Sequence, residues 1–232
     1  MIDEKFSISV IVPSKNDEEI FLSFYKSIKN YLIEKKWNFE IIFVSNGSSL
    51  KNLKLIDTIT DEDFIHINLK QSGKGYAIKS GIEQSKYKNI LFMDADCSVE
   101  INELDKFVIN NKLKSTVMIG TRRTNKSINK GTPLLRRLSG TVYLLFVKLL
   151  FGLNLTDTQC GFKVFDKTAY ESLEYIRFNN FSFDIELLIK FSKKNRIMEI
   201  PVMYIHNDNS KVSLMKDSFF MFFDLIILKL RN

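Results

Sequence analysis

The chain has 232 residues and a formal net charge of +7, because 34 Lys and Arg residues outnumber 27 Asp and Glu residues. Hydrophobic residues make up 45% of the chain and charged residues 26%, a composition that excludes disordered and fibrous proteins. The two cysteines, Cys97 and Cys160, are too few for a disulfide framework, so we expect a reducing compartment.

The first half of the chain alternates between short apolar runs and stretches with helical spacing of apolar residues. Pro13 is expected to stop the first strand. Strands that alternate with helices imply a parallel sheet covered on both faces, with ligands at the carboxyl ends of its strands. The predicted strands cover residues 6–12, 39–44, 64–69, 89–93 and 116–120, and the predicted helices cover 18–35 and 75–85.

The second half is less regular, and it contains no repeat or linker. The chain is therefore expected to form one α/β domain over residues 1–232. Acidic residues precede the first apolar run, and the longest uncharged runs reach ten residues against the roughly 20 of a spanning helix. We therefore expect neither a signal peptide nor a membrane-spanning segment. The remaining predicted elements are helices at 132–150, 183–193 and 213–231, a strand at 198–206, and a polar loop at 156–165 that leads into a short strand.

The basic residues are concentrated between residues 106 and 156, where ten Lys and Arg residues occur without a single Asp or Glu. This local positive charge implies an anionic partner, and nucleic acid, a phosphorylated substrate and an acidic membrane surface all fit. The alternative is a solvated surface. Nucleic acid is disfavoured, because no reading helix or aromatic stacking motif is recognisable.

Two carboxylates, Asp94 and Asp96, follow the predicted strand at 89–93. Residues two apart in an extended chain point to the same side, and neighbouring carboxylates repel one another unless a cation accompanies them. Because no Cys or His pattern lies nearby, the suited cation is a hard one, Mg²⁺ or Mn²⁺. The alternative is that Asp96 or Ser98 caps a helix that starts near Glu100.

Cationic side chains also occur at predicted strand ends and helix starts. Lys74 lies in a turn before a helix, where it can reach an anion, although the surrounding sequence fits neither the P-loop nor the dinucleotide fingerprint. Arginine binds phosphate through paired hydrogen bonds, and two arginine pairs lie close together in the sequence. These pairs are Arg122-Arg123 and Arg136-Arg137.

Asp184 and Glu186 are candidates for a general base or for a residue that orients one. The alternative is a structural role, because the N-terminus of a helix favours acidic side chains.

Nine short motifs occur one after another along the chain. They are V-I-V-P-S-K-N-D-E at 10–18, E-I-I-F-V-S-N-G-S at 40–48, G-K-G at 73–75, M-D-A-D at 93–96, G-T-R at 120–122, R-R at 136–137, D-T-Q-C-G-F-K at 157–163, F-D-I-E at 183–186 and S-K at 210–211. Together they resemble family 2 glycosyltransferases of the GT-A fold, in particular the polyprenyl-phosphate subgroup and its dolichyl-phosphate β-glucosyltransferase branch. The chain departs from that pattern where Lys15 replaces the usual Tyr and Ser45-Asn46 replaces the usual Asp-Asp.

The resemblance implies a role for each matching residue. The residues expected around the donor nucleotide are Pro13, Asn16, Glu18, Ser45, Asn46, Lys74 and Asp94. Asp94 and Asp96 would hold Mg²⁺ or Mn²⁺ on the diphosphate. The residues expected around the acceptor phosphate are Arg122, Arg136 and Arg137. The residues expected to act in catalysis are Asp96, Arg122 and Asp184, the last at the position where relatives with hydroxyl acceptors carry their base.

The activity implied by the resemblance is metal-dependent, inverting transfer of a sugar, UDP-glucose being the favoured donor, to polyprenyl phosphate. A phosphate monoester is already ionised near neutral pH, so such an enzyme needs a cationic pocket rather than a strong base. Two alternatives stay open: a hydroxyl acceptor in surface-polysaccharide assembly, for which Asp184 would be indispensable, and GDP-mannose as the donor. We expect residues 6–121 to bind the nucleotide-sugar and residues 122–232 to bind the acceptor.

Two helices of the C-terminal half, at 134–151 and 213–231, are apolar around most of their circumference. They are expected to lie at a bilayer surface, with an oligomer interface or core packing as the alternatives. We therefore expect a cytoplasmic protein that associates peripherally with the inner face of the membrane, with a homo-oligomer as a further prospect.

Overall fold

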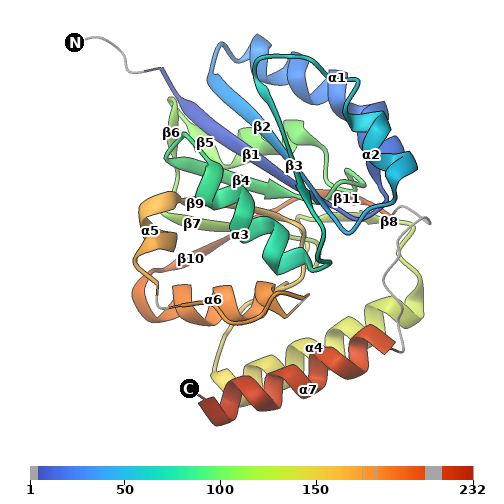
Figure 1. Cartoon of the computed structure of the whole chain (residues 1–232). Helices are drawn as coiled ribbons and strands as arrows, with labels where there is room; N and C mark the ends of the chain where they lie inside the picture. The colour runs from blue at the N-terminus through green and yellow to red at the C-terminus, as the bar shows by residue number, and fades with distance from the viewer. Residues whose placement is uncertain (1–4, 174, 181, 207–215, 232) are drawn as a thin grey trace.

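The computed structural model describes residues 5–173, 175–180, 182–206 and 216–231 (Figure 1). Its strands are β1 (Ser7–Ser14), β2 (Asn38–Asn46), β3 (Phe64–Leu69), β4 (Asn89–Met93), β5 (Val108–Ile109), β6 (Lys112–Leu113), β7 (Val117–Thr121), β8 (Ile128–Lys130), β9 (Phe162–Asp166), β10 (Ile197–Pro201) and β11 (Met203–Ile205). Its helices are α1 (Glu18–Glu34), α2 (Leu50–Ile56), α3 (Lys74–Gln84), the 3₁₀ helix η1 (Ile101–Lys106), α4 (Leu134–Phe151), α5 (Lys167–Glu171), α6 (Phe183–Lys194) and α7 (Lys216–Arg231).

A central sheet organises the fold. Within the described residues it has seven strands in the order β10-β7-β9-β4-β1-β2-β3. The pairs β1–β2, β1–β4, β2–β3 and β7–β10 are parallel, whereas β9 runs antiparallel between β4 and β7. The predicted α/β class with a mostly parallel sheet is therefore confirmed. Because parallel strands β1, β4 and β7 end at the same edge, the residues that follow them gather there.

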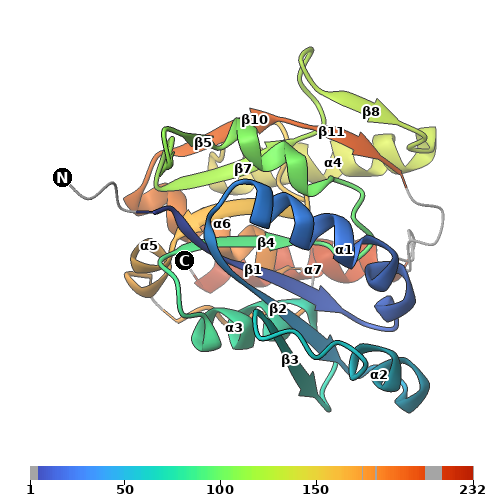
Figure 2. The same ribbon diagram turned by 90° about the horizontal axis from the view of Figure 1, so that it is seen from above.

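Helices cover both faces of this sheet (Figures 1 and 2). On one face α1 and η1 bury apolar side chains such as Phe21, Leu32 and Leu104 against β1, β2 and β4. On the other face α3 and α6 bury Ile78 and Phe183 in a second apolar cluster. Burying both faces explains why the strands read as nearly continuous apolar runs.

A third layer lies beyond α6, where α4 and α7 pack side by side (Figure 1). Tyr143 and Phe146 of α4 contact Phe222 of α7 with ring centroids 5.5 and 5.2 Å apart. Buried residues of α6, among them Ile185 and Leu188, complete this cluster. The pair of helices therefore forms one wall that faces the carboxyl ends of the strands.

Two of the predicted strands differ from the structure around prolines. β1 continues through Pro13 to Ser14, since its pairing with β4 ends at Ile11 and only β2 accompanies its last residues. A proline is tolerated where a strand lacks a neighbour on one side. The single strand predicted at 198–206 is wrong, because β10 ends at Pro201 and β11 then joins β8 in a separate small sheet.

Some predicted helices also differ from the structure. The helix expected near Glu100 is the short 3₁₀ helix η1, and its first turn has no side-chain cap. The last predicted helix is present from Lys216, while its expected start at 213–215 lies outside the described residues, as do Ser210 and Lys211. Among the described helices, none combines the length and hydropathy needed to cross a membrane.

Candidate active site

A cavity of about 930 Å³ opens at the carboxyl ends of β1, β4 and β7, between the sheet and the wall made by α4 and α7. Most of the residues predicted for the site line it, and they come from both halves of the chain. Those residues are Pro13, Asn16, Asn46, Lys74, Asp94, Asp96, Arg122, Arg136 and Arg137. Glu18, Ser45 and Asp184 are not among the described residues that line it.

The acidic pair lies directly after β4. Asp94 is 40% exposed, and its backbone N–H donates to the carbonyl oxygen of Gly161 at 3.0 Å. A Cβ atom at Gly161 would come within 1.8 Å of Asp94 Oδ2, so glycine is required for this carboxylate to occupy its place. Asp96 accepts a hydrogen bond from Ser98 N at 3.0 Å, which closes a local turn and caps no helix.

The pKa values of the two carboxylates shift in opposite directions. Burial opposes ionisation of Asp94, but Lys74 and Lys163 outweigh it and hold the pKa of Asp94 below its ordinary value. Burial and the charge of Asp94 raise the pKa of Asp96. Two acidic oxygen donors of this kind suit Mg²⁺ or Mn²⁺, which complete their coordination with water and substrate phosphates. Among the described residues, no group of three or more His, Cys, Asp or Glu side chains is arranged to hold a metal ion, so the protein's own share of such a site would be this pair.

Lys74, the first residue of α3, connects the acidic pair to the protein interior. Its Nζ lies 2.8 Å from Asp94 Oδ1 and 3.5 Å from Asp184 Oδ2. Asp184 is 2% exposed, and its other oxygen accepts a hydrogen bond from Lys163 Nζ at 2.6 Å. The predicted general base therefore lies behind the cavity wall in a buried ion pair, with both of its oxygens facing ammonium groups.

The turn that carries Lys74 is fixed by its two glycines. Gly73 has a φ of +155°, and a Cβ there would come within 2.4 Å of the carbonyl oxygen of Asn179. A Cβ at Gly75 would lie 2.5 Å from Phe183 Cβ. Asn46 accepts a hydrogen bond from Gly73 N at 3.0 Å and joins this turn to the end of β1. Asn46 thus has a structural role at the cavity wall.

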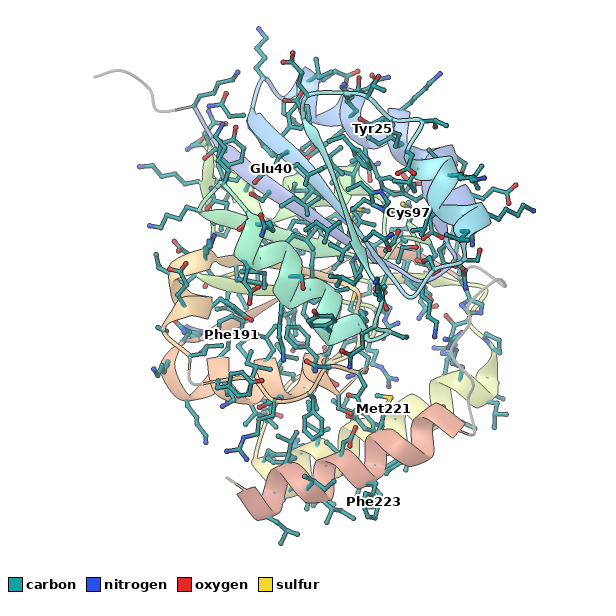
Figure 3. The ribbon with its side chains drawn as sticks, viewed as in Figure 1. Tyr25, Glu40, Cys97, Phe191, Met221 and Phe223 are labelled. Atoms are coloured by element: carbon teal, nitrogen blue, oxygen red, sulfur yellow. The ribbon has the colours of Figure 1, made fainter. Side chains whose placement is uncertain are left out.

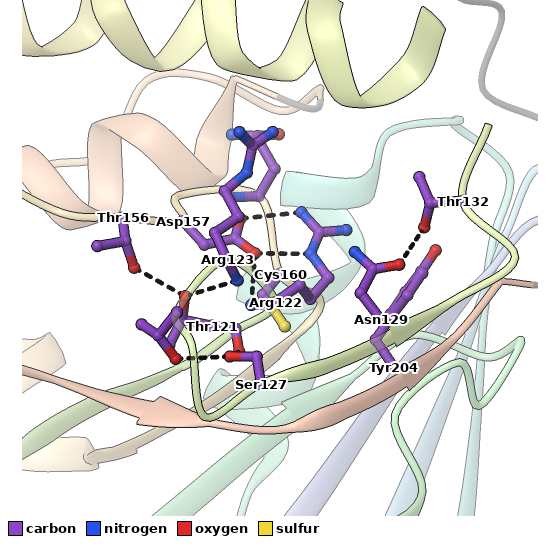
Figure 4. A network of polar contacts seen from close by, with 12 residues as sticks. Thr121, Arg122, Arg123, Ser127, Asn129, Thr132, Thr156, Asp157, Cys160 and Tyr204 are labelled. Carbon is purple, nitrogen blue, oxygen red and sulfur yellow. Dashed lines mark hydrogen bonds and ion pairs between the residues drawn. The ribbon is translucent and has the colours of Figure 1, made fainter. Parts of the chain in front are cut away.

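Arg122 is held by a carboxylate for which sequence reasoning gave no role. Its Nε donates to Asp157 Oδ2 at 2.6 Å and its Nη2 donates to Asp157 Oδ1 at 2.9 Å (Figure 4). Its guanidinium carbon also lies 5.1 Å from the centre of the Tyr204 ring. Burial opposes ionisation of Asp157, but Arg122 outweighs it and lowers the pKa of Asp157. Arg122 is therefore a fixed cation at the cavity wall, its orientation set by Asp157.

The other arginines lie on the opposite wall or reach toward it. Arg136 and Arg137 belong to the first turn of α4 and line the cavity. Arg123 crosses from β7 to α4, where its Nη1 donates to Thr141 Oγ1 at 2.8 Å. A Cβ at Gly140 would lie 2.4 Å from its Nη2, so that glycine admits the side chain. The sequence-predicted arginine pairs are brought to one cavity.

Glu18 and Ser45 contact one another, and neither is among the described residues that line the cavity. Ser45 Oγ donates to Glu18 Oε1 at 3.0 Å and lies 3.1 Å from His66 Nε2. His66 in turn lies 3.1 Å from Asp57 through its other ring nitrogen. Asn16 takes a positive φ of 62°, and its side chain accepts a hydrogen bond from Ser49 N at 2.8 Å.

Comparison with known proteins identifies the family. A model described as Glycosyl transferase family 2 matches residues 9–174. The dolichyl-phosphate beta-glucosyltransferase of Saccharomyces cerevisiae is 31% identical to this chain over 257 residues, covering 98% of this chain and 75% of that protein. The human dolichyl-phosphate beta-glucosyltransferase is 28% identical, covering 97% of this chain and 75% of that protein. The glycosyltransferase AglD of Haloferax volcanii is 24% identical and covers 90% of this chain, which spans 35% of that longer protein.

Solved structures share the fold at low sequence identity. Mannosyl-3-phosphoglycerate synthase from Rubrobacter xylanophilus superposes with a TM-score of 0.74 at 16% identity, covering 97% of this chain and 74% of that one. Glucosyl-3-phosphoglycerate synthase from Mycobacterium tuberculosis, crystallised with Mn²⁺, UDP and glucosyl-3-phosphoglycerate, gives a TM-score of 0.72 at 16% identity, covering 97% and 80% of the two chains. The predicted GT-A architecture is confirmed. The chain belongs to glycosyl transferase family 2 and is a glycosyltransferase.

Proposed function

We propose that this enzyme transfers a glucosyl residue from UDP-glucose to a polyprenyl phosphate of the dolichyl type, with Mg²⁺ or Mn²⁺ as cofactor. The names of its relatives in yeast and human support the acceptor and the sugar. The observation that carries the proposal is the composition of the cavity, where the Asp94–Asp96 pair and the arginines share one space from which Asp184 is withdrawn. An acceptor that is already an anion needs no base there.

The donor would bind at the ends of β1 and β4. Pro13, Asn16 and Asn46 would lie around the nucleotide, with Glu18 and Ser45 supporting them from beneath. Lys74 would contact the diphosphate. Asp94 and Asp96 would hold the metal ion, which when bound supplies positive charge to the leaving diphosphate.

The acceptor phosphate would bind opposite the donor. Arg122 offers an oriented guanidinium, and Arg136 and Arg137 add positive charge from α4. An oxygen of the acceptor phosphate would form the new bond to the anomeric carbon while the bond from that carbon to the nucleotide diphosphate breaks. A single displacement of this kind inverts the anomeric configuration.

We further propose that the outward face of α4 and α7 rests on the membrane that contains the acceptor. Large apolar side chains on this face are 45–82% exposed, and Lys148 of α4 is exposed as well. In Figure 3 Met221, which lines the cavity, lies on the inner side of α7, and Phe223 lies on the outer side. A helix pair with basic and apolar side chains suits an anionic lipid surface. The apolar residues that make this face include Leu134, Leu138, Leu145, Leu149, Phe223 and Leu230.

A vesicle sedimentation experiment tests the membrane proposal. Leu149→Glu places a charge on an exposed position of this face, so we expect binding to anionic vesicles to fall severalfold while the fold persists. Ile33→Glu changes an equally apolar exposed residue of α1 and serves as the matched control. The opposing result has two parts: the wild type sediments as a dimer that Leu149→Glu dissociates, and vesicle binding is unchanged in the variant. That result would assign the face to a second copy of the chain instead.

A two-phase transfer assay tests the reaction itself. The enzyme is given a polyprenyl phosphate, Mn²⁺ or Mg²⁺, and labelled UDP-glucose, other UDP-sugars or GDP-mannose in turn. Label is expected in the organic phase from UDP-glucose, with a metal ion present, and to fall about 10²–10³-fold in Asp96→Ala. Asp63→Ala, which changes an exposed carboxylate outside the cavity, is the control. Donor consumption without lipid labelling would contradict the acceptor and point to a hydroxyl group.

A further inference from the structure

A lysine occupies the middle of the central sheet. Lys163 of β9 pairs with Phe92 of β4 on one side and with Ile119 of β7 on the other, and it is 1% exposed. Its neighbour on the same face two residues on, Phe165, belongs to the apolar cluster beneath α3 and α6. A central position of this kind is ordinarily apolar, because burying a charge is costly unless it is paired.

The Lys163 ammonium group has several partners within the part of the chain that the structure describes. Nζ donates to the carbonyl oxygen of Cys160 at 2.7 Å and to Asp184 Oδ1 at 2.6 Å, and it lies 5.0 Å from the centre of the Phe92 ring. Well-packed apolar residues often stabilise a core as well as a buried ion pair does. Stability alone therefore gives no reason for this pair, and its further contacts suggest another use.

The pair continues outward to the cavity. The second carboxylate oxygen of Asp184 lies 3.5 Å from Lys74 Nζ, which lies 2.8 Å from Asp94 Oδ1. Two ammonium groups and two carboxylates thus alternate from the middle of the sheet to the cavity wall. The two inner groups are 1–2% exposed, whereas Lys74 and Asp94 line the cavity.

We propose that Lys163 and Asp184 are positioning residues that fix Lys74 at the cavity wall for the diphosphate of the donor. Lys74 has a long, flexible side chain, and an anchor on its inner side removes rotamers that point away from the site. A phosphate oxygen can then replace Asp94 as the outer partner of Lys74 while Asp184 keeps the inner contact. Lys163 is needed because it supplies the second positive charge beside Asp184, without which that carboxylate would draw Lys74 inward.

This inference rests on the proposed donor site and assigns Asp184 a different task from that of a base. A base must reach the acceptor, and Asp184 is separated from the cavity by Lys74. The positioning role predicts an effect on donor affinity, and a base predicts an effect on turnover at saturating donor.

The test uses the full chain and measures nucleotide binding by calorimetry. The wild type is titrated with UDP and with GDP in the presence of Mn²⁺, and the nucleotide that binds more tightly is the probe. The double variant Lys163→Met/Asp184→Asn removes both buried charges, so it is expected to keep the melting temperature of the wild type. Its affinity for the probe is expected to fall about tenfold, the effect of losing one charged contact. Lys88→Met/Asp166→Asn, which neutralises an ion pair outside the cavity, is the matched control.

Coupling to Lys74 separates positioning from a purely structural effect. Lys74→Met is expected to weaken the probe to a similar degree, and adding it to the double variant is expected to cost little more, since both changes remove one interaction. In steady-state assays the KM of the donor should rise while the KM of the lipid acceptor stays constant.

Three results would overturn the inference. Unchanged probe affinity in a folded double variant would contradict the positioning role and leave the proposed reaction standing. A fully additive loss of affinity when Lys74→Met is combined with the double variant would do the same. A wild type that binds neither nucleotide would contradict the proposed donor site and this inference with it. Weakened binding together with absent transfer to lipid would instead keep the positioning role and refute the acceptor.

Discussion

Gly161 is the residue at which the smallest chemical change should most disturb the site. In Gly161→Ala the new Cβ would lie 1.8 Å from Asp94 Oδ2 and 2.1 Å from its Cγ, whereas real Cβ contacts under 3.0 Å essentially never occur. The Asp94 carboxylate must therefore move by more than about 1 Å, and misplacements of about 1 Å can cost about 10²-fold in rate. This loss in kcat/KM corresponds to about 2.7 kcal/mol of transition-state stabilisation.

The assay compares transfer kinetics and Mn²⁺ affinity of the wild type with those of the variant. The backbone of Gly161 lies outside the left-handed region, so alanine adds no backbone strain there, and the nearest contacts of its Cβ are with Asp94. Gly152→Ala is the control, since its φ of +65° strains an alanine by about 1 kcal/mol while nothing lies within 4 Å of the new Cβ. A Gly161→Ala enzyme with wild-type kcat/KM and wild-type Mn²⁺ affinity would refute the placement of Asp94 at the reacting centre.

Three further changes test the walls of the cavity. Asp157→Asn leaves the Arg122 guanidinium without its carboxylate and is expected to cost about 3 kcal/mol in the free energy of unfolding near neutral pH. Burial alone would raise the pKa of Asp157, but Arg122 lowers this pKa below its ordinary value of about 4. The stability advantage of the wild type over Asp157→Asn should therefore persist above about pH 4 and fade as the pH drops through the lowered pKa. Urea unfolding across that pH range measures this advantage, and a difference that does not change with pH would contradict the prediction. Arg122→Lys gives up one of the paired hydrogen bonds to Asp157, and the KM of the acceptor is expected to rise about tenfold in transfer assays, unlike the KM of the donor. Gly75→Ala forces a Cβ to within 2.5 Å of Phe183 Cβ, and thermal melts should show a loss of about 2 kcal/mol, an unchanged melting temperature being the opposing result.

Local patterns in the sequence predicted most of the fold. The five strands of the first half and the helices at α1, α3, α4 and α6 lie within a few residues of the expected ranges, because both faces of the sheet are buried and each run is marked by its apolar residues. The short helices α2 and α5 were not predicted, since a helix of five to seven residues shows barely two turns of periodicity. Two further differences from the predicted strands occur at prolines, at the end of β1 and between β10 and β11. Whether a strand tolerates proline depends on which strands pair with it in the sheet. The order of strands in the sheet differs from their order in the sequence, so the sequence does not show these pairings.

In the site, too, local sequence patterns predicted some residues, whereas contacts between distant strands could not be predicted. The acidic pair and the arginines could be found because parallel strands end at one edge, so that residues following separate strands are expected to gather there. Partnerships across the sheet could not be found in this way. Asp157, Lys163 and Tyr204 contact site residues, yet nothing in their immediate sequence indicates which cation, carboxylate or ring each one meets.

The position of strand β9 in the sheet explains why contacts such as those of Asp157 and Lys163 could not be predicted. It enters the sheet antiparallel between β4 and β7, so the loop that precedes it passes the carboxyl ends of both parallel strands. Asp157 thereby reaches Arg122 after β7, Gly161 makes room for Asp94 after β4, and Lys163 reaches Asp184 at the start of α6. One stretch of seven residues therefore sets the position of a cation and a carboxylate on different strands. A substitution in it should disturb the residue of the cavity wall that it contacts, even where the substituted side chain never touches a ligand.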